Sequence, residues 1–253
     1  MYDALSVDYD RFVNWQGRLT IELPFMIEKL HEAQSKIILD AATGTGMHAI
    51  ALAQCGFTTS GADLSPGMIE RARVNAASAS IQVRFEIAGF GTLSRVFGEG
   101  SFDALLCLGN SLPHLLSLPE LSTTLVDFAA CLQRGGLLLL QNRNLDAVMA
   151  HHERWMEPQA YIDGDTQWVF QRFYDFDPDG LLTFNMVTLK KTGHDSWTQS
   201  VTTSRLRPLL KDELIASLTA AGFAVRYIYG SMTGEAFEPE TSPNLVVVAR
   251  LSV

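Results

Sequence analysis

A glycine-rich turn flanked by two acidic residues is the part of the sequence best suited to hold a ligand. Residues 37–46 read IILDAATGTG, an apolar run that ends at Asp40 and is followed by Gly44 and Gly46. Glycines in such a turn let a ligand approach the backbone closely. Asp63 closes a second apolar run, where a carboxylate can accept hydrogen bonds from the two hydroxyls of a ribose. The pattern predicts a site for a nucleoside.

The details of this turn favour a methyltransferase over a nicotinamide dehydrogenase, which shares the glycines and the acid. Ala49 stands where the third glycine of a dinucleotide turn would be. Asp40 ends the strand at a point where nicotinamide-binding strands carry a small or apolar residue. Structural roles stay open for both acids: Asp40 could cap the loop, and Asp63 could cap a helix that begins at Ser65-Pro66.

A second group of candidates follows two later strands. The apolar run 102–108 leads into Gly109-Asn110-Ser111-Leu112-Pro113-His114-Leu115, and open sheets bind ligands at the carboxyl ends of their strands. This loop lacks the Asn/Asp-Pro-Pro-Tyr turn of nucleic-acid amino-methylases, which argues against a base as substrate. Arg143 offers the planar fork that fits a carboxylate, although a salt bridge to Asp146 or another acid would also explain this residue. Asn110 could be a simple turn residue, and we interpret His114 as structural.

The elements that must position these residues alternate between strands and helices. Apolar runs of strand length lie at 37–41, 58–62, 81–87, 102–108 and 137–141. Helical spacing is found at 47–54, which Gly56 closes, at 66–77, and at 119–132, which Gly135 and Gly136 close. This order predicts a parallel sheet covered by helices on both faces.

The segments before and after these alternating strands and helices show other patterns. Residues 15–31 are amphipathic and predict a helix over the ligand edge of the sheet, interrupted or restarted at Pro24. Residues 167–176, 181–190 and 197–206 alternate apolar and polar side chains, which predicts an antiparallel meander. A helix at 211–221 and strands at 223–229 and 245–251 follow.

We expect a single domain over 1–253 with a helical cap at 1–33 and an inserted segment at about 152–207. If the meander forms a lid or a subunit contact, five of its residues would lie near the substrate: Tyr161, Trp168, Arg172, Arg205 and Arg207. The alternative for most of them is a solvated position on the surface.

The composition of the chain limits the kinds of molecule that it can be expected to bind. The formal charge is −9 and the pI is near 5.1, so no overall field attracts nucleic acid or an anionic membrane. No apolar run approaches the ~20 residues that span a bilayer, and the acidic, aromatic N-terminus is unlike a secretory signal. Cys55, Cys107 and Cys131 lie in apolar segments without a metal-binding pattern, and we expect three buried thiols. These features predict a cytoplasmic protein that acts on a small molecule, without a metal; they leave the oligomeric state open.

Five motifs are spread over the chain: NWQGR at 14–18, DAATGTG at 40–46, CLGNSLPHL at 107–115, NRNLDA at 142–147 and FNM at 184–186. In these motifs the sequence resembles the glycine and sarcosine N-methyltransferases. It implies a Rossmann-like seven-stranded class I methyltransferase sheet, α/β in class and mostly parallel, with a reversed C-terminal hairpin and the meander as an insertion. It also implies S-adenosylmethionine as cofactor and S-adenosylhomocysteine as product.

The resemblance also assigns roles to residues. It places Trp15 and Arg18 over the cofactor, with Arg18 holding the methionyl carboxylate and Tyr2 or Tyr9 lining the same entrance. Arg143 would grip a substrate carboxylate with Asn110 nearby, and these two are the catalytic candidates. The substrate-binding candidates are Tyr2, Asn110, Arg143 and Asn144. The cofactor-binding candidates are Tyr9, Trp15, Arg18, Asp40, Ala41, Gly44, Gly46, Asp63, Leu64, Met68, Gly89, Phe90, Leu108, Gly109, Asn110 and His114.

The expected reaction is in-line displacement, in which the amine nitrogen of a glycine- or sarcosine-like amino acid attacks the methyl carbon. Two departures from the family pattern bear on the ligands. The 88–91 loop has no acid for the adenine amino group, so backbone groups of Ala88–Gly89 and stacking on Phe90 would have to bind the adenine; a core position for Phe90 is the alternative. Leu145 replaces an aromatic residue, which makes room for a bulkier or less polar acceptor. The alternatives are an O- or S-methyltransferase of another metabolite and a non-catalytic module that binds the cofactor.

Overall fold

The computed structural model describes residues 8–252, and its larger sheet contains seven strands. Their spatial order is β10-β11-β5-β4-β1-β2-β3, in which β11 runs antiparallel to its two neighbours and the other pairs are parallel. The strands are β1 (Ile37–Ala41), β2 (Thr58–Asp63), β3 (Arg84–Ile87), β4 (Phe102–Cys107), β5 (Leu132–Arg143), β10 (Phe223–Tyr229) and β11 (Asn244–Leu251). The predicted α/β class and the reversed C-terminal hairpin are confirmed.

Helices cover both faces of this sheet because its central strands are apolar on both sides. Leu138 and Leu140 of β5 pack into one core cluster with α5 (Leu93–Phe97), α6 (Leu118–Cys131) and α8 (Lys211–Ala220). Leu137 and Leu139 point the other way, into a cluster with α2 (Trp15–Glu32) and α3 (Met47–Gln54). The helix α4 (Pro66–Ser78) packs beside α3 on that second face. The side chains of β5 alternate between the two layers, as a strand buried on both faces requires.

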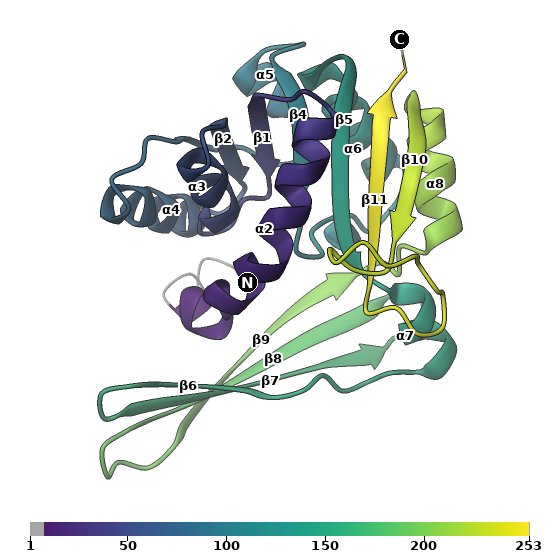
Figure 1. Cartoon of the computed structure of the whole chain (residues 1–253). Helices are drawn as coiled ribbons and strands as arrows, with labels where there is room; N and C mark the ends of the chain where they lie inside the picture. The colour runs from purple at the N-terminus through teal and green to yellow at the C-terminus, as the bar shows by residue number, and fades with distance from the viewer. Residues whose placement is uncertain (1–7, 253) are drawn as a thin grey trace.

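A second sheet of four strands lies beyond the carboxyl ends of the parallel strands (Figure 1). Its order is β6-β7-β8-β9, and all its pairs are antiparallel. The strands are β6 (Gln159–Asp163), β7 (Thr166–Phe176), β8 (Leu182–Thr192) and β9 (Thr198–Leu206), and α7 (Leu145–His151) connects β5 to them. The 3-10 helix η1 (Leu112–His114) contacts β9: the Arg207 N–H donates to the Pro113 carbonyl at 2.8 Å.

Several predicted elements need correction. The run 81–87 forms a strand only over Arg84–Ile87, and α2 continues through Pro24 without interruption. Gly135 and Gly136 do not end a helix, because α6 stops at Cys131 and both glycines lie inside β5. There the pairing with β4 shifts register, and Gly135 takes a φ of +73°, which glycine adopts without strain.

Some features escaped the sequence patterns altogether. The meander has a fourth strand, β6, and the short helices α5 and α7 were not expected. The expectation of three buried thiols is wrong for Cys55, which is exposed, whereas Cys107 and Cys131 are buried. Within residues 8–252, no helix is long and apolar enough to cross a membrane. The division into one domain with a cap and an insertion stays a prediction.

Candidate functional site

Two adjoining cavities lie at the carboxyl ends of the parallel strands, and the second of them also reaches the four-stranded sheet. The first, here the glycine-turn cavity, has a volume of about 590 Å³ and is lined by the 42–44 turn, by the ends of β1 and β2, and by the 87–90 loop. The second, here the inter-sheet cavity, has a volume of about 440 Å³ and is lined by the end of β5 and by β7 and β8. The side chains or backbone of Tyr9, Arg18, Gly109 and His114 line both.

The glycine turn is braced by Asp63. One carboxylate oxygen of Asp63 accepts a hydrogen bond from the Gly44 N–H at 2.9 Å, and the other accepts from the Ser65 N–H at 2.9 Å. Ser65, not Asp63, caps α4, because its hydroxyl accepts from the Met68 N–H at 3.1 Å. Gly44 has a φ of +56°, and a Cβ there would point toward the ring of Tyr9, 3.8 Å away. Gly44 and Tyr9 both line the glycine-turn cavity.

Asp40 lies at the floor of the glycine-turn cavity. Its carboxylate accepts a hydrogen bond from the Thr43 hydroxyl at 2.6 Å, and the residue is only 2% exposed. Burial raises the pKa of Asp40, with His48, Thr43 and Arg18 acting in the opposite direction. The loop-capping role is therefore present, and it coexists with a position on the cavity wall.

Asp10 holds residues 8–12 over the same cavity. Its carboxylate accepts hydrogen bonds from the Thr45 hydroxyl at 2.6 Å and from the Trp15 indole at 2.9 Å, and it pairs with Arg71 of α4 at 2.8 Å. These contacts connect the N-terminal segment to the glycine turn and to α4. They explain how Tyr9, one residue earlier, comes to line both cavities.

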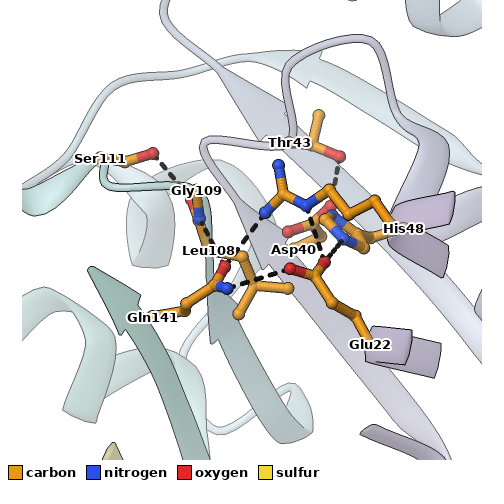
Figure 2. A network of polar contacts seen from close by, with 9 residues as sticks. Glu22, Asp40, Thr43, His48, Leu108, Gly109, Ser111 and Gln141 are labelled. Carbon is orange, nitrogen blue, oxygen red and sulfur yellow. Dashed lines mark hydrogen bonds and ion pairs between the residues drawn. The ribbon is translucent and has the colours of Figure 1, made fainter. Parts of the chain in front are cut away.

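Arg18 belongs to a buried polar network that joins α2 to β5, whose partners Figure 2 shows. Its guanidinium donates to Glu22 at 2.8 Å and to the Gln141 side-chain oxygen at 3.0 Å. Gln141 donates in turn to Glu22 at 3.0 Å and accepts from the Gly109 N–H at 3.2 Å, while His48 contacts Glu22 at 2.7 Å. The cation is thus fixed in place where the two cavities meet.

Glu22 is the charged centre of this network. Burial by itself would raise its pKa, but the hydrogen bond with His48 and the nearby Arg18 guanidinium outweigh burial and lower the pKa to about 2. Sequence reasoning missed both Glu22 and Gln141. The spacing of four residues between Arg18 and Glu22 on one helix is the signal that could have found the first.

The floor of the inter-sheet cavity carries three polar side chains from the β4 and β5 ends. The side-chain oxygen Oδ1 of Asn110 accepts from the backbone N–H of Arg143 at 3.0 Å, with Asn110 in the left-handed region at a φ of +70°. The Arg143 guanidinium pairs with Glu153 at 3.2 Å and lies 5.8 Å from the centre of the Tyr174 ring. Asn142 is 1% exposed, and neither atom of its amide has a hydrogen-bond partner among the described residues.

The roof of the inter-sheet cavity comes from one face of β7 and β8. Arg172 pairs in register with Met186 and Tyr174 with Phe184, so these four side chains share a face. Burial lowers the pKa of Arg172, with Arg143 adding to the effect, and burial raises the pKa of Tyr174. The Arg172 Nε is buried and finds no hydrogen-bond acceptor within the described chain.

His114 lies at the edge shared by the two cavities. Its Nδ1 is 3.1 Å from the Ser204 hydroxyl of β9, so it helps to connect the two sheets. Burial lowers its pKa to about 4, and the imidazole is therefore neutral at pH 7. This contact fits the structural role that the sequence suggested.

The structure brings most of the predicted residues to these cavities. The inter-sheet cavity is lined by Asn110, predicted also for the cofactor, and by Arg143. The glycine-turn cavity is lined by Tyr9, Trp15, Arg18, Asp40, Gly44, Asp63, Leu64, Met68, Gly89, Phe90, Leu108, Gly109 and His114.

Three predicted residues lie elsewhere. Ala41 is fully buried in the core, and a Cβ at Gly46 would come within 2.6 Å of the Phe85 ring of β3, so Gly46 serves the packing of the turn against its neighbours. The Asn144 amide donates to the Pro239 and Ser242 carbonyls at 2.8 and 2.9 Å and its oxygen caps α7, away from the cavity. Tyr2 is outside the described residues.

The meander contributes one of its five named residues. Arg172 lines the inter-sheet cavity, whereas Tyr161, Trp168, Arg205 and Arg207 are not among its lining residues. Arg205 pairs with Asp179 and Arg207 with Glu213, each at 2.6 Å. The alternation of side chains along β9 turns Arg205 to the face opposite Leu206, which lines the cavity.

The comparisons with known proteins agree with this geometry. A methyltransferase domain family matches residues 38–136. Glycine/sarcosine N-methyltransferase of Aphanothece halophytica is 33% identical over 222 residues, which cover 88% of this chain and 79% of that protein. The enzyme of the same name from Halorhodospira halochloris is 35% identical over 202 residues, covering 75% and 73%.

Solved structures support the fold. An S-adenosylmethionine-dependent methyltransferase from Clostridium acetobutylicum superposes with a TM-score of 0.78 at 17% identity, over 100% of this chain and 96% of that one. An amino pentose methyltransferase from Micromonospora echinaspora, solved with S-adenosylmethionine bound, gives a TM-score of 0.71 at 19% identity, over 99% and 96%.

Proposed function

This chain belongs to the glycine/sarcosine N-methyltransferase family and is an S-adenosylmethionine-dependent methyltransferase, and from that premise we propose that it methylates the amine nitrogen of a small amino acid. The observation that carries the proposal is the meeting of two cavities at Arg18 and Gly109. One has the carboxylate and glycine turn that suit a nucleoside; the other has the guanidinium and amides that suit an amino acid.

The glycine-turn cavity fits the cofactor in shape and in donor set. At Gly44 a Cβ would point toward Tyr9, and at Gly89 a Cβ would meet Leu64 at 3.1 Å, so side chains at either position would fill the cradle. Asp63 has two carboxylate oxygens at the end of β2 and would hold the ribose hydroxyls. When bound, S-adenosylmethionine supplies the methyl group that the amine accepts by in-line displacement.

The chain's own residues bind and orient the partners. Arg18, fixed by Glu22 and Gln141, would pair with the methionyl carboxylate of the cofactor. Arg143 would bind the acceptor carboxylate, and the unpartnered amide of Asn142 would orient the amine beside Asn110. Holding two reactants in line and excluding water can lower a barrier by roughly 7–11 kcal/mol, so no acid–base pair is required.

The cellular setting we propose is the cytoplasm, with a free metabolite as acceptor. The formal charge of −9 gives no overall attraction to nucleic acid or to anionic membranes. The three cysteines are free, as is usual in a reducing compartment.

The test is calorimetric titration with S-adenosylmethionine, followed by an S-adenosylhomocysteine release assay over glycine, sarcosine and larger amino acids. We expect cofactor binding and turnover on at least one amino acid, with mass spectrometry locating the new methyl group on nitrogen. Cofactor binding without turnover on any amine would refute the proposed acceptor class. Methylation at oxygen or sulfur would refute N-methylation and keep the family.

A further inference from the structure

The inter-sheet cavity holds two guanidinium groups from opposite walls. Arg143 stands at the end of β5 in the seven-stranded sheet, and Arg172 projects from β7 in the four-stranded sheet. Both line the same space, and each is close enough for its charge to act on the other. A third cation, Arg18, is already paired with Glu22 at 2.8 Å. The cavity therefore presents two arginines to whatever occupies it.

The two arginines differ in how their charge is compensated. Arg143 has Glu153 at 3.2 Å. Arg172 has no carboxylate within ion-pair distance in residues 8–252, and its Nε is buried without an acceptor. Its guanidinium lies 4.8 Å from the centre of the Phe12 ring, an attraction weaker than an ion pair in a desolvated site.

An unpaired cation in such a place is costly to the protein. Burial lowers the pKa of Arg172, and the charge of Arg143 lowers it further. Both effects mean that the environment disfavours the charged form of Arg172. Buried charges are normally paired, and a buried polar group without a partner calls for an explanation such as a bound ion. An anionic group of a ligand would supply the missing partner.

The size of the cavity leaves space for such a group. Its volume of about 440 Å³ is in the range of sites that hold ligands of drug size, well above the volume of glycine. A carboxylate bound at Arg143 leaves the Arg172 side of the cavity to the rest of the acceptor. The lining residues around Arg172 include Tyr9, Phe12, Tyr174, Phe184 and Met186, none of which carries a negative charge at pH 7.

We propose that Arg172 binds a second carboxylate of the acceptor, so that the preferred acceptor is a dicarboxylic amino acid such as aspartate or glutamate. This rests on the proposed function, because it takes Arg143 as the partner of the first carboxylate. With both carboxylates bound, each guanidinium has an anion, and the α-amine lies on the floor near Asn110 and Asn142. Glycine would leave Arg172 unpaired.

The experiment compares charged and neutral acceptors of matched size. The release assay is run with aspartate, asparagine, glutamate, glutamine and glycine on the wild type and on Arg172→Met, which removes the charge and keeps much of the side-chain volume. Arg172→Gln is a second uncharged variant in case the first fails to fold. Arg205→Met is the control, because Arg205 lies on the opposite face of the same sheet and pairs with Asp179. Calorimetry with S-adenosylhomocysteine checks that each variant keeps its cofactor site.

We expect the wild type to prefer one of the two acids over its amide by about 30-fold or more in kcat/KM, mainly through KM, as a buried charge pair would give. The ratio of kcat/KM between acid and amide should fall to about threefold or less in both Arg172 variants and should stay as in the wild type in Arg205→Met. Acceptor titrations of the enzyme with S-adenosylhomocysteine should show the same ratios in affinity.

Three results would overturn the inference. The first is a wild type that turns over glycine or the amides as well as the acids. The second is an Arg172 variant in which acids, amides and glycine lose activity equally, which would mean that both arginines hold one carboxylate. Turnover on no amino acid at all would instead refute the proposed function, and this inference with it.

Discussion

Arg143 shows how a single side chain is prepared for a ligand. Its N–H is held by Asn110 at 3.0 Å, and its guanidinium lies beside Glu153 and over the Tyr174 ring. The group is thereby kept at the cavity floor with about 29% of the side chain exposed. An arginine fixed in this way can offer a carboxylate two parallel hydrogen bonds, which a lysine cannot.

Arg143→Lys should therefore weaken acceptor binding without affecting the cofactor. Losing one of two charge-assisted hydrogen bonds, each worth about 1.5–3 kcal/mol, should raise the acceptor KM by about tenfold or more. Steady-state kinetics and calorimetry with S-adenosylmethionine measure the two effects. Arg154→Lys, at an exposed pair with Asp175, is the control and should change neither. An unchanged KM in Arg143→Lys would remove Arg143 from the acceptor site.

Glu22→Gln tests the buried network through its pH dependence. The carboxyl has a pKa of about 2 in the fold and near 4.5 in the unfolded chain, so its ionised form stabilises the fold by about 3 kcal/mol at pH 7. That contribution is complete above about pH 5 and declines as the pH falls toward 2. Urea unfolding should show Glu22→Gln less stable than the wild type at pH 7, with the difference shrinking below pH 4.5. The exposed Glu240→Gln should show no such trend, and a constant difference in Glu22→Gln would contradict the pKa.

At the residue scale, the sequence located the side chains that follow strands and missed those that come together only in three dimensions. Asp63 was found because it ends an apolar run at a predictable edge, and Arg143 because it lies in a motif that resembles the N-methyltransferases. Gln141 and Asn142 belong to the same strand end as Arg143, yet their role depends on contacts with α2 and on the buried space above them. Arg172 was named only as one of five meander residues, because its separate role depends on how the second sheet lies over the first, which no local pattern encodes.

At the scale of elements, the β1 to α3 connection depends on a close approach between helices and strands. A Cβ at Gly46 would lie 2.6 Å from the Phe85 ring and 2.9 Å from the Ala72 Cβ, at a φ of +80°. Phe85 belongs to β3 and Ala72 to α4, so the glycine lets three elements meet behind the turn. The cofactor cradle is shaped by this packing.

Gly46→Ala should destabilise the protein by about 2–5 kcal/mol, which combines left-handed strain of about 1–2 kcal/mol with overpacking of about 1–3 kcal/mol. Gly56→Ala is the matched control, because Gly56 also has a positive φ of +94° but a Cβ there would meet nothing within 4 Å. Gly56→Ala should therefore reduce the free energy of unfolding only by the contribution of left-handed strain. Free energies of unfolding in urea measure both, and equal losses would contradict the packing role of Gly46.

The elements also show why some predictions from sequence succeed. Strands β1, β4 and β5 were found because burial on both faces makes them continuously apolar. Gly135 and Gly136 were misread because glycine serves both a helix stop and a strand bulge, and only the pairing with β4 decides between them. The strand β6 was missed because it is largely exposed and pairs with β7 alone.

At the scale of the whole molecule, the two sheets are joined near η1 and are separate at their far ends. The His114–Ser204 contact and the Arg207–Pro113 hydrogen bond connect them, and Phe12 packs against Phe170 at 5.6 Å between ring centres. Figure 1 shows β6 and the ends of β7 to β9 extending away from the larger sheet. Residues 197–201 are exposed, in contrast to the buried centre of β11.

Hydrogen exchange should reveal this difference. Strands with few buried contacts open locally, whereas core strands exchange only on global unfolding. We expect β6 and residues 198–201 to exchange first and the centres of β4, β5 and β11 to exchange last. Adding S-adenosylhomocysteine with an acceptor should slow exchange near Arg172 and Tyr174 and leave 198–201 unchanged. Uniform rates across both sheets, or protection at 198–201, would contradict this description.

The roof of the inter-sheet cavity has a further consequence for how such proteins diversify. Met156, Arg172, Tyr174, Phe184 and Met186 all come from one continuous stretch of chain, whereas the glycine turn, Asp63 and the 87–90 loop come from another, much earlier one. Mutations within a single segment of the gene can therefore change which acceptor is recognised, while the segment that encodes the cofactor site stays unchanged. An exchange of the former segment between relatives would carry acceptor preference with it, which makes it the natural unit for engineering new methylations.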